Sequence, residues 1–471
     1  MMARWGGGAW LFFSILFMAC GLMLSAPAYA FMTLKDIPPL TYDLTQDEAQ
    51  LKSLMEPIEE TPMDNKDLAM SFSLPKNWVR YDMEANKEVL SGVSSEMQGN
   101  EGKKIGFASN IRGFKDYSIA GNQDGDIFSM LVKYTTPARL ERPSEFRVRS
   151  IELDSLVSLE NWFIEFLLQM GFTPEGVEKK SENRLEAQYT IFENGEPYSV
   201  RGVLMRTGSR IILAEYLVHQ ENIEKDRDFQ ILAMRDFKLN QINEATPVQL
   251  NNYNFVDIAK FSYPKNWILY SSGIRTIDRM EASIINLKGV VNPDQKAITA
   301  MQLNGRIDIT IVSKYVGTTP EQEVTAIGNE LKKRGLILKD AMKDDDFPQL
   351  NPQIISKNLL VYHILPPKDD AMKINQFSGV QKNRLGLVDY EYWLAVLQTE
   401  GRQYYIRLLT IGRGEDFRAW SENLETYRTL LSSISPINDN AHENRDLLTQ
   451  PAKPATSPTD SKTDGATQGG E

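Results

Sequence analysis

Residues 72–81 read Phe-Ser-Leu-Pro-Lys-Asn-Trp-Val-Arg-Tyr, and residues 261–270 read Phe-Ser-Tyr-Pro-Lys-Asn-Trp-Ile-Leu-Tyr. Seven of the ten positions are identical, at a separation of 189 residues. We call this ten-residue stretch the motif. Similarity at a fixed spacing is the signature of a duplicated folding unit. The sequence therefore predicts two related domains in one chain.

Three residues of the motif have a clear structural role in each copy. Proline fixes φ and lacks an N–H donor, so it is expected to end a strand or to mark a sheet edge. The Lys-Asn pair then turns the chain, and the tryptophan ring packs against the sheet. The alternative is a tryptophan that stacks on a ligand. The predicted structural residues are Phe72, Pro75, Trp78, Phe261, Pro264 and Trp267.

An amphipathic helix follows each copy of the motif. In the first, the apolar residues of 156–170 fall on one helical face and Gly171 ends the helix. In the second, Thr319 is the predicted N-cap, with Pro320 at the first helical position and Gln322 completing a capping box. Gly335 is the expected end of this second helix.

Antiparallel strands come next in both copies. Asn194-Gly195 between two apolar runs is a strong hairpin signal, and Thr207-Gly208-Ser209 marks a second turn. The second copy has strands at 390–397 and 404–410 around Glu400-Gly401. A last amphipathic helix closes each copy; in the second, its apolar face runs from Phe417 to Ile434. This order predicts the α+β class, with two tandem antiparallel sheets each sandwiched by helices.

The repeat and the changes in composition predict the domain boundaries. Residues 31–68 are polar and are expected to form a lead-in with a short helix near 46–55. Residues beyond 438 are rich in Pro, Thr, Ser and Asp, so we expect them to be disordered. The predicted segments are 1–30 signal peptide, 31–68 lead-in, 69–241 first domain, 242–254 linker, 255–436 second domain and 437–471 tail.

The repeated Phe-Ser-x-Pro-x-x-Trp opening and the closing amphipathic helix resemble the PsbP-like superfamily, which includes the periplasmic DcrB type. The resemblance covers both copies, and its recognisable part is the short block around Trp78 and Trp267. It implies an antiparallel sheet sandwiched by helices. It also implies non-enzymatic work in binding, assembly or stabilisation of other proteins. The family has no catalytic motif to transfer, and a tandem pair departs from its usual single domain.

The N-terminus has the three parts of a secretory signal peptide: a positive charge at Arg4, an apolar run over residues 9–24, and a small-residue Ala28-Tyr29-Ala30 ending. We expect export to the periplasm and cleavage after Ala30. Two alternatives remain open, an uncleaved membrane anchor and a lipid attached to Cys20. Either one would be the route to membrane association.

Composition excludes several classes of function. The chain has 471 residues, 42% hydrophobic and 24% charged, which suits a globular protein. Its net charge of −11 argues against a nucleic-acid partner, because phosphate backbones attract basic surfaces. The single cysteine lies in the predicted signal peptide, so the mature chain can form no intramolecular disulfide. Packed cores must therefore supply the stability.

Candidate catalytic and metal-binding residues are few. His219, His363 and His442 show no metal-ligand spacing, and we expect no metal and no cofactor. Asn122-Gln123-Asp124-Gly125-Asp126 looks like part of a calcium loop, but Leu131 stands where the last ligand is needed. Asp344-Asp345-Asp346 is most simply a solvated loop. Paired carboxylates for glycoside hydrolysis cannot be assigned without a local motif.

These observations favour a non-catalytic periplasmic protein that binds or stabilises protein partners, in an envelope-associated complex. Two similar domains on one chain raise effective affinity when both engage. A small-molecule or lipid binder is the first alternative, and it requires a pocket between sheet and helix. A hydrolase that uses carboxylates or Ser/Tyr chemistry is the second.

Overall fold

The computed structural model describes residues 33–81, 128–137, 142–193, 195–245, 248–255, 258–276, 278–292, 297–333, 337–365 and 390–439. The predicted signal peptide, the Asn122–Asp126 loop, Gly335, His442 and residues 440–471 of the predicted tail lie outside these ranges. No helix in the described ranges is long and apolar enough to cross a membrane.

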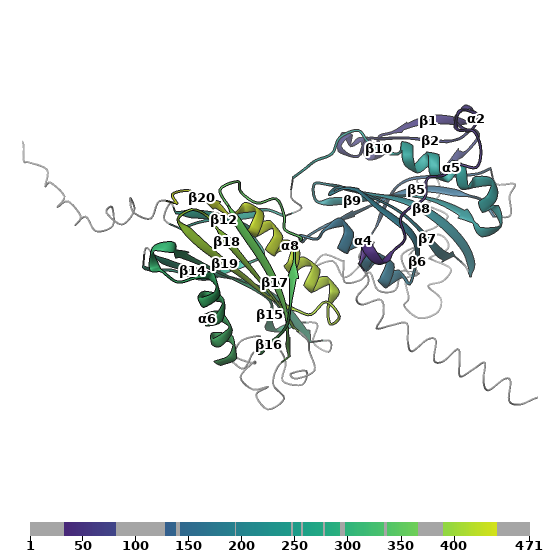
Figure 1. Cartoon of the computed structure of the whole chain (residues 1–471). Helices are drawn as coiled ribbons and strands as arrows, with labels where there is room; N and C mark the ends of the chain where they lie inside the picture. The colour runs from purple at the N-terminus through teal and green to yellow at the C-terminus, as the bar shows by residue number, and fades with distance from the viewer. Residues whose placement is uncertain are drawn as a thin grey trace, which may run out of the picture.

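The described chain forms two domains of the α+β class with antiparallel sheets, which confirms the predicted fold class (Figure 1). Each domain has one seven-stranded and one three-stranded sheet. In the first domain the orders are β3-β4-β5-β9-β8-β7-β6 and β1-β2-β10. In the second they are β13-β14-β15-β19-β18-β17-β16 and β11-β12-β20. The two orders match strand for strand, as duplication of one folding unit requires.

The elements of the first domain follow the chain from the lead-in to β10. Its helices and short 3₁₀ turns are η1 Leu34–Asp36, α2 Glu48–Ser53, η2 Pro62–Asp64, η3 Lys66–Leu68, α4 Leu159–Met170, η7 Gln220–Asn222 and α5 Ile223–Asp236. Its strands are β1 Met55–Glu60, β2 Met70–Pro75, β3 Val79–Arg80, β4 Ser129–Thr135, β5 Glu145–Glu152, β6 Thr173–Ser181, β7 Arg184–Glu193, β8 Glu196–Thr207, β9 Arg210–His219 and β10 Lys238–Leu239.

The second domain has the corresponding ten strands and two long helices in the same order. Its helices are η8 Lys314–Val316, α6 Pro320–Lys333 and α8 Phe417–Ser433. Its strands are β11 Leu250–Phe255, β12 Ala259–Pro264, β13 Ile268–Thr276, β14 Arg279–Asn292, β15 Ala297–Ser313, β16 Ile337–Asp344, β17 Ser356–Leu365, β18 Tyr390–Gln398, β19 Arg402–Ile411 and β20 Ser435–Pro436.

Each seven-stranded sheet is covered on both faces. In the first domain, one set of alternating β9 residues, such as Ala214, packs with α5 and the three-stranded sheet. The other set, such as Leu213, packs with α4. The second domain repeats this division, with α8 against one face and α6 against the other. Alternation along the strands therefore supplies two cores per sheet, because successive side chains point to opposite faces.

The local turn and cap signals form as predicted. Gly171 ends α4 in the left-handed region, at φ 66. The Thr319 hydroxyl accepts from the Gln322 N–H, and the Gln322 side chain accepts from the Thr319 N–H, which completes the capping box. Gly195 and Gly208 sit at positive φ in the β7–β8 and β8–β9 turns. Glycine tolerates this conformation because it has no Cβ.

The chain around each domain is more ordered than a lead-in and a linker. Residues 55–60 form β1, which pairs with β2 along its full length, and residues 250–255 form β11 in the same position on β12. After α5, the Asn243 carbonyl accepts from the Gly208 N–H at 2.7 Å. After α8, the Asp439 carboxylate accepts from the Gly401 N–H at 2.9 Å. Each domain thus includes residues on both sides of the predicted boundaries.

The two domains contact each other between the approach to α4 and the exposed face of α8. The Ser155 hydroxyl donates to Glu422 at 2.9 Å, and Arg418 lies 3.4 Å from the Asp154 carboxylate. Arg418 also pairs with Glu422 on its own helix, at 2.7 Å. These contacts are polar, as is common for interfaces between domains of one chain.

Candidate partner-binding surface

The motif forms the same strand and strand end in both domains. Phe72 and Phe261 are buried near the middle of β2 and β12. Pro75 and Pro264 are the last residues of these strands. The next residue, Lys76 or Lys265, donates its backbone N–H to the segment just before β1 or β11 at 2.9 Å. The proline therefore stands where the ladder ends and no donor is needed.

The two tryptophans differ in burial. Trp267 is 3% exposed and belongs to the core under α8. Trp78 is half-buried and packs from the rim against Tyr216, with ring centroids 5.0 Å apart. The preceding turns differ as well. Asn77 is left-handed at φ 73, whereas the second turn is closed by the Trp267 N–H donating to the Pro264 carbonyl at 2.9 Å.

The strand that follows each tryptophan lies at the edge of its seven-stranded sheet. The residues one and three positions after the tryptophan are apolar or aromatic and exposed in both copies. Tyr270 is 65% exposed and Val79 is 55% exposed. We call these four residues the edge stripe: Val79, Tyr81, Ile268 and Tyr270. In the first domain, Lys133 Nζ lies 5.5 Å from the centre of the Tyr81 ring.

The sequence analysis did not single out the edge stripe, although a signal for it was present. Tyr81 and Tyr270 occupy the same motif position and are among its seven identities. The exposed lysine of the motif has a structural partner in both copies: the Lys76 side chain donates to the Ser53 carbonyl at 2.8 Å, and the Lys265 side chain donates to Gln249. The exposed tyrosine is thus the position that makes the edge stripe a candidate surface.

A buried ionic cluster lies on the face of the first seven-stranded sheet that α4 covers. Glu215 is fully buried and accepts from Arg147 at 2.8 Å, Arg149 at 2.7 Å and the Tyr189 hydroxyl at 2.6 Å. Burial opposes ionisation, but the two guanidiniums and the hydrogen bonds outweigh it and lower the pKa of Glu215 to about 2. A carboxylate held in this way is ionised and fully engaged, so its role is structural.

The second domain reverses the charges at the same place. Arg147 pairs across the strands with Glu215, whereas the corresponding cross-strand pair is Asp308 and Arg407. Asp308 binds Arg306 at 2.9 Å, and Arg407 donates to Thr310 at 2.8 Å. Reaction chemistry depends on the sign of each group, so this exchange of charges indicates a packing role in both domains.

Glu391 forms another buried polar cluster in the second domain. Its carboxylate accepts from the indole N–H groups of Trp420 at 2.6 Å and Trp393 at 3.0 Å. The Arg413 guanidinium lies over the Phe417 and Trp420 rings, 5.0 Å from each centre. These contacts tie the start of β18 to α8 and fill the space between them with protein groups.

The two described histidines, His219 and His363, lie in different domains. His219 is buried at the end of β9, where Nε2 lies 3.2 Å from Glu196 and Nδ1 accepts from the Glu221 N–H at 3.3 Å. His363 is on β17, opposite Glu391. Within the described ranges, no three His, Cys, Asp or Glu residues gather closely enough to hold a metal ion.

The aspartate run of residues 344–346 begins at the end of β16. Asp346 pairs with Arg428 on α8 at 2.7 Å, and hydrogen bonding to this guanidinium lowers the pKa of Asp346. The Asp344 carboxylate accepts from the Asp346 N–H at 2.9 Å. These partners are protein groups, so the run serves the loop itself.

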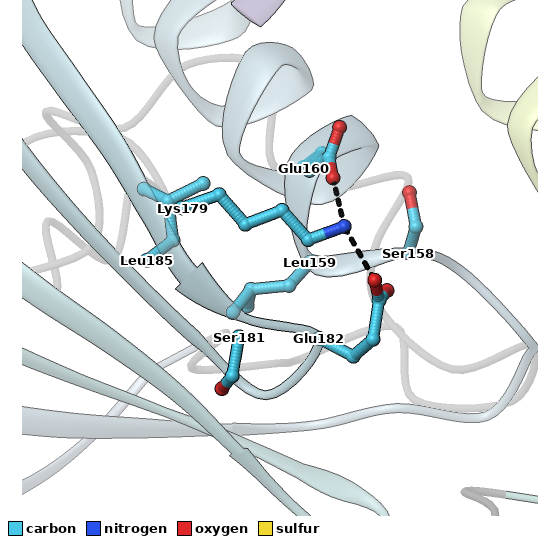
Figure 2. Close-up of a pocket in the computed structure, with 7 residues that line it drawn as sticks. All are labelled: Ser158, Leu159, Glu160, Lys179, Ser181, Glu182 and Leu185. Carbon is cyan, nitrogen blue, oxygen red and sulfur yellow. Dashed lines mark ion pairs between the residues drawn. The ribbon is translucent and has the colours of Figure 1, made fainter. Parts of the chain in front are cut away.

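A small hollow lies beside the start of α4 (Figure 2). Among its lining residues, Lys179 lies between Glu160 and Glu182, with its Nζ 2.7 Å from the Glu182 carboxylate. Burial lowers the pKa of Lys179, but the two carboxylates outweigh burial and raise it overall. The cavity volume is about 10 Å³, enough for about one water molecule and too small for a lipid. The lining residues are Ser158, Leu159, Glu160, Lys179, Ser181, Glu182 and Leu185.

Comparison with known proteins assigns no family to the chain. No protein family matches the sequence, and no curated protein matches it. Among solved structures, the solution structure of cyanobacterial PsbP from Synechocystis is 12% identical and has a TM-score of 0.21. The match covers 42% of this chain and 98% of that one.

Two further structures have similarly low scores. The T6SS immunity protein TplEi from Pseudomonas aeruginosa is 8% identical, with a TM-score of 0.18 and coverage of 66% of this chain and 95% of that one. The Tle4-Tli4 complex is 9% identical, with a TM-score of 0.18 and coverage of 78% and 95%. Scores of this size carry no argument about function, which must come from the chain itself.

Proposed function

We propose that this is a non-catalytic periplasmic protein that binds protein partners through the edge stripe of each domain. The observation that carries the proposal is the repeated exposure: Val79 and Tyr81 in one domain, Ile268 and Tyr270 in the other. Burying these residues in their own domain would have been favourable, because each apolar side chain gains about 1.5–3 kcal/mol when removed from water. Their exposure in both copies favours a partner that covers them.

The chemistry of the stripe suits protein recognition. Tyrosine offers a large rigid ring and a polar hydroxyl, a combination that is common at the energetic centres of interfaces. The stripe lies on edge strands, where a partner can approach both the side chains and the backbone. Two stripes on one chain allow bivalent binding, which raises avidity without new contacts.

The compartment and the family belong to the same proposal. The signal-peptide pattern of residues 1–30 supports export to the periplasm, and the motif with the repeated strand order supports a PsbP-like classification. Sequencing the N-terminus of the protein from a periplasmic fraction tests the first part. A mature chain that starts at Phe31 is expected, and a chain that keeps residues 1–30 would indicate an anchor instead.

Site-specific photo-crosslinking in cells tests the binding proposal. A photoreactive phenylalanine analogue replaces Tyr81 in one variant and Tyr270 in another. The matched control places it at Phe192, which is 67% exposed at a hairpin tip and belongs to neither stripe. We expect the same protein adduct at 81 and 270 and no such adduct at 192. Equal labelling at all three positions, or none at 81 and 270, would contradict the proposal.

A substitution series measures how much each of the two stripes contributes to binding of the partner. We expect Tyr81→Ser and Tyr270→Ser each to weaken capture about tenfold and the double variant to weaken it by more than the product of the two, because bivalency is lost. Phe192→Ser is the control, with capture unchanged. Hydrogen exchange of the purified variants verifies that both domains stay folded.

A further inference from the structure

The first domain covers one edge of its large sheet with its own lead-in. Residues 38–40 run along β6, the terminal strand, in parallel. The Val177 N–H donates to the Pro38 carbonyl at 2.9 Å, and the Leu40 N–H donates to the Val177 carbonyl at 3.2 Å. Gly176 and Val177 are buried as a result. The fold therefore accepts an extended segment at this edge.

The corresponding strand of the second domain is β16, which also ends its sheet. Both strands carry a register shift at the same place, between Pro174 and Gly176 in β6 and between Lys339 and Met342 in β16. Beyond the shift, Val177 pairs with Ala187 on β7, and Lys343 pairs with Leu360 on β17. Lys343 thus occupies the place of Val177 and directs its backbone N–H and C=O to the open side.

Among the described residues, none pairs with the outer edge of β16. Met342 is 51% exposed and Ile337 is 45% exposed, in contrast to the buried Gly176 and Val177 of β6. The length of the preceding chain explains the difference. More than twenty residues precede β1, whereas only residues 240–249 separate β10 from β11. Such a short connection leads directly into β11, so residues 240–249 do not reach the far edge of the sheet as residues 38–40 do in the first domain.

We propose that the β16 edge binds an extended apolar segment of a partner protein, with acidic residues at its ends, parallel to the strand. The choice of occupant follows the two lysines of the strand and the cis segment on β6. Lys339 and Lys343 are exposed on β16, where Lys343 also pairs with the exposed Asp345 at 3.3 Å. The cis segment on β6 has the same character, because Ile37-Pro38-Pro39-Leu40-Thr41-Tyr42 is flanked by Asp36 and Asp43. This site is separate from the edge stripe, which lies on the opposite edge strand of the sheet.

The two edges differ in how closely a segment can approach. A Cβ at Gly176 would lie 3.2 Å from the Leu40 Cα, which is tighter than ordinary contact. Met342 stands at this place in β16, so the bound segment must sit a few tenths of an ångström further out than residues 38–40 sit on β6.

Binding of a labelled peptide to the full chain tests the proposal. The probe is a synthetic peptide of residues 36–43 with an N-terminal fluorophore, and anisotropy reports binding. We expect saturable binding that weakens at least tenfold in Lys343→Pro, because proline removes the outward N–H. Lys343→Glu should weaken it several-fold, and replacing both peptide aspartates by asparagine should do the same. Lys332→Glu on α6 is the charge-matched control and leaves binding unchanged.

Several outcomes would overturn the proposal. Charged residues and bulges also protect edge strands from aggregation. Self-association of the Lys339→Ser, Lys343→Ser double variant without peptide binding to the parent chain would assign the lysines to protection alone. Peptide binding that is insensitive to both Lys343 variants would indicate exchange with the first domain's own segment. Hydrogen exchange excludes unfolding as the cause, and unchanged crosslinks at 81 and 270 separate this site from the edge stripe.

Discussion

The two domains have the same strand order but different buried polar residues. The first buries a carboxylate among two arginines, where Glu215 meets Arg147 and Arg149. The second has the opposite charge at the corresponding cross-strand position, with Arg407 opposite Asp308. The motif tryptophan is at the rim in one domain and in the core in the other. The alternation of apolar residues, the glycine turns and the motif thus specify the fold, and the polar interior is free to diverge.

The largest expected effect comes from the fully buried carboxylate of the first domain. Glu215→Gln leaves Arg149 buried without its counter-charge and Arg147 with Glu193 alone, so we expect a loss of about 3–5 kcal/mol in the free energy of unfolding of that domain. Asp308→Asn, at the partly exposed site in the second domain, should cost about 1 kcal/mol. Urea unfolding followed by hydrogen-exchange mass spectrometry reports each domain separately. Equal losses would contradict the contrast.

Acid should act on the first domain through the same carboxylate. The pKa of Glu215 is lowered from 4.5 to about 2 in the folded state, so its stabilising contribution is complete above the unfolded value. The contribution is lost as the pH falls from about 4.5 to about 2, because the unfolded state binds a proton in this range before the folded state does. Unfolding curves of the first domain measured between about pH 6 and 2.5 check this. In Glu215→Gln, the free energy of unfolding of the first domain should depend less on pH in the acid range. An unchanged pH dependence in this variant would mean that other groups cause the acid destabilisation.

The two tryptophans provide a test within the motif itself. Trp267→Ala removes a core ring and should cost about 3–5 kcal/mol in the second domain. Trp78→Ala removes a half-buried ring, so we expect about half that loss in the first domain. Domain-resolved unfolding measures both. A larger loss for Trp78→Ala would mean that the rim contact with Tyr216 matters more than burial indicates.

The smallest expected effect concerns the turn before each tryptophan. Asn77 is left-handed at φ 73. This conformation costs most residues about 1–2 kcal/mol because the Cβ approaches the backbone, whereas Gly and Asn adopt it more readily. Asn77→Ala should therefore destabilise the first domain by about 1 kcal/mol, and Asn77→Gly should not. Asn266 has no such φ, so Asn266→Ala should change the second domain by less than about 0.5 kcal/mol. Thermal unfolding of the three variants decides whether the identical pair has one role or two.

The sequence predicted those parts of the fold that local chemistry controls. Gly195, Gly208 and Gly171 are turn or cap residues for a stereochemical reason, and the Thr319 capping box depends on residues three apart. β1 was missed because it reads Met-Glu-Pro-Ile-Glu-Glu, and its exposed face makes it look like polar lead-in. Its pairing with β2 is a long-range property that no local pattern encodes.

The candidate surface was harder to predict than the fold. The motif drew attention to its buried residues, because a repeated tryptophan is the strongest apolar signal. Tyr81 and Tyr270 were equally visible as identities, but their exposure depends on the strand being at a sheet edge. The difference between the β6 and β16 edges depends on where residues 38–40 pass, which only the three-dimensional arrangement reveals.

In each domain the first and last strands, β1 and β10 or β11 and β20, flank one central strand of the three-stranded sheet. All strands of the larger sheet lie between these two strands in the sequence, so the chain leaves each domain from the small sheet. A gene segment that encodes such a unit can be copied in tandem without rethreading either copy. This architecture is open to concatenation, and the present pair is its shortest array.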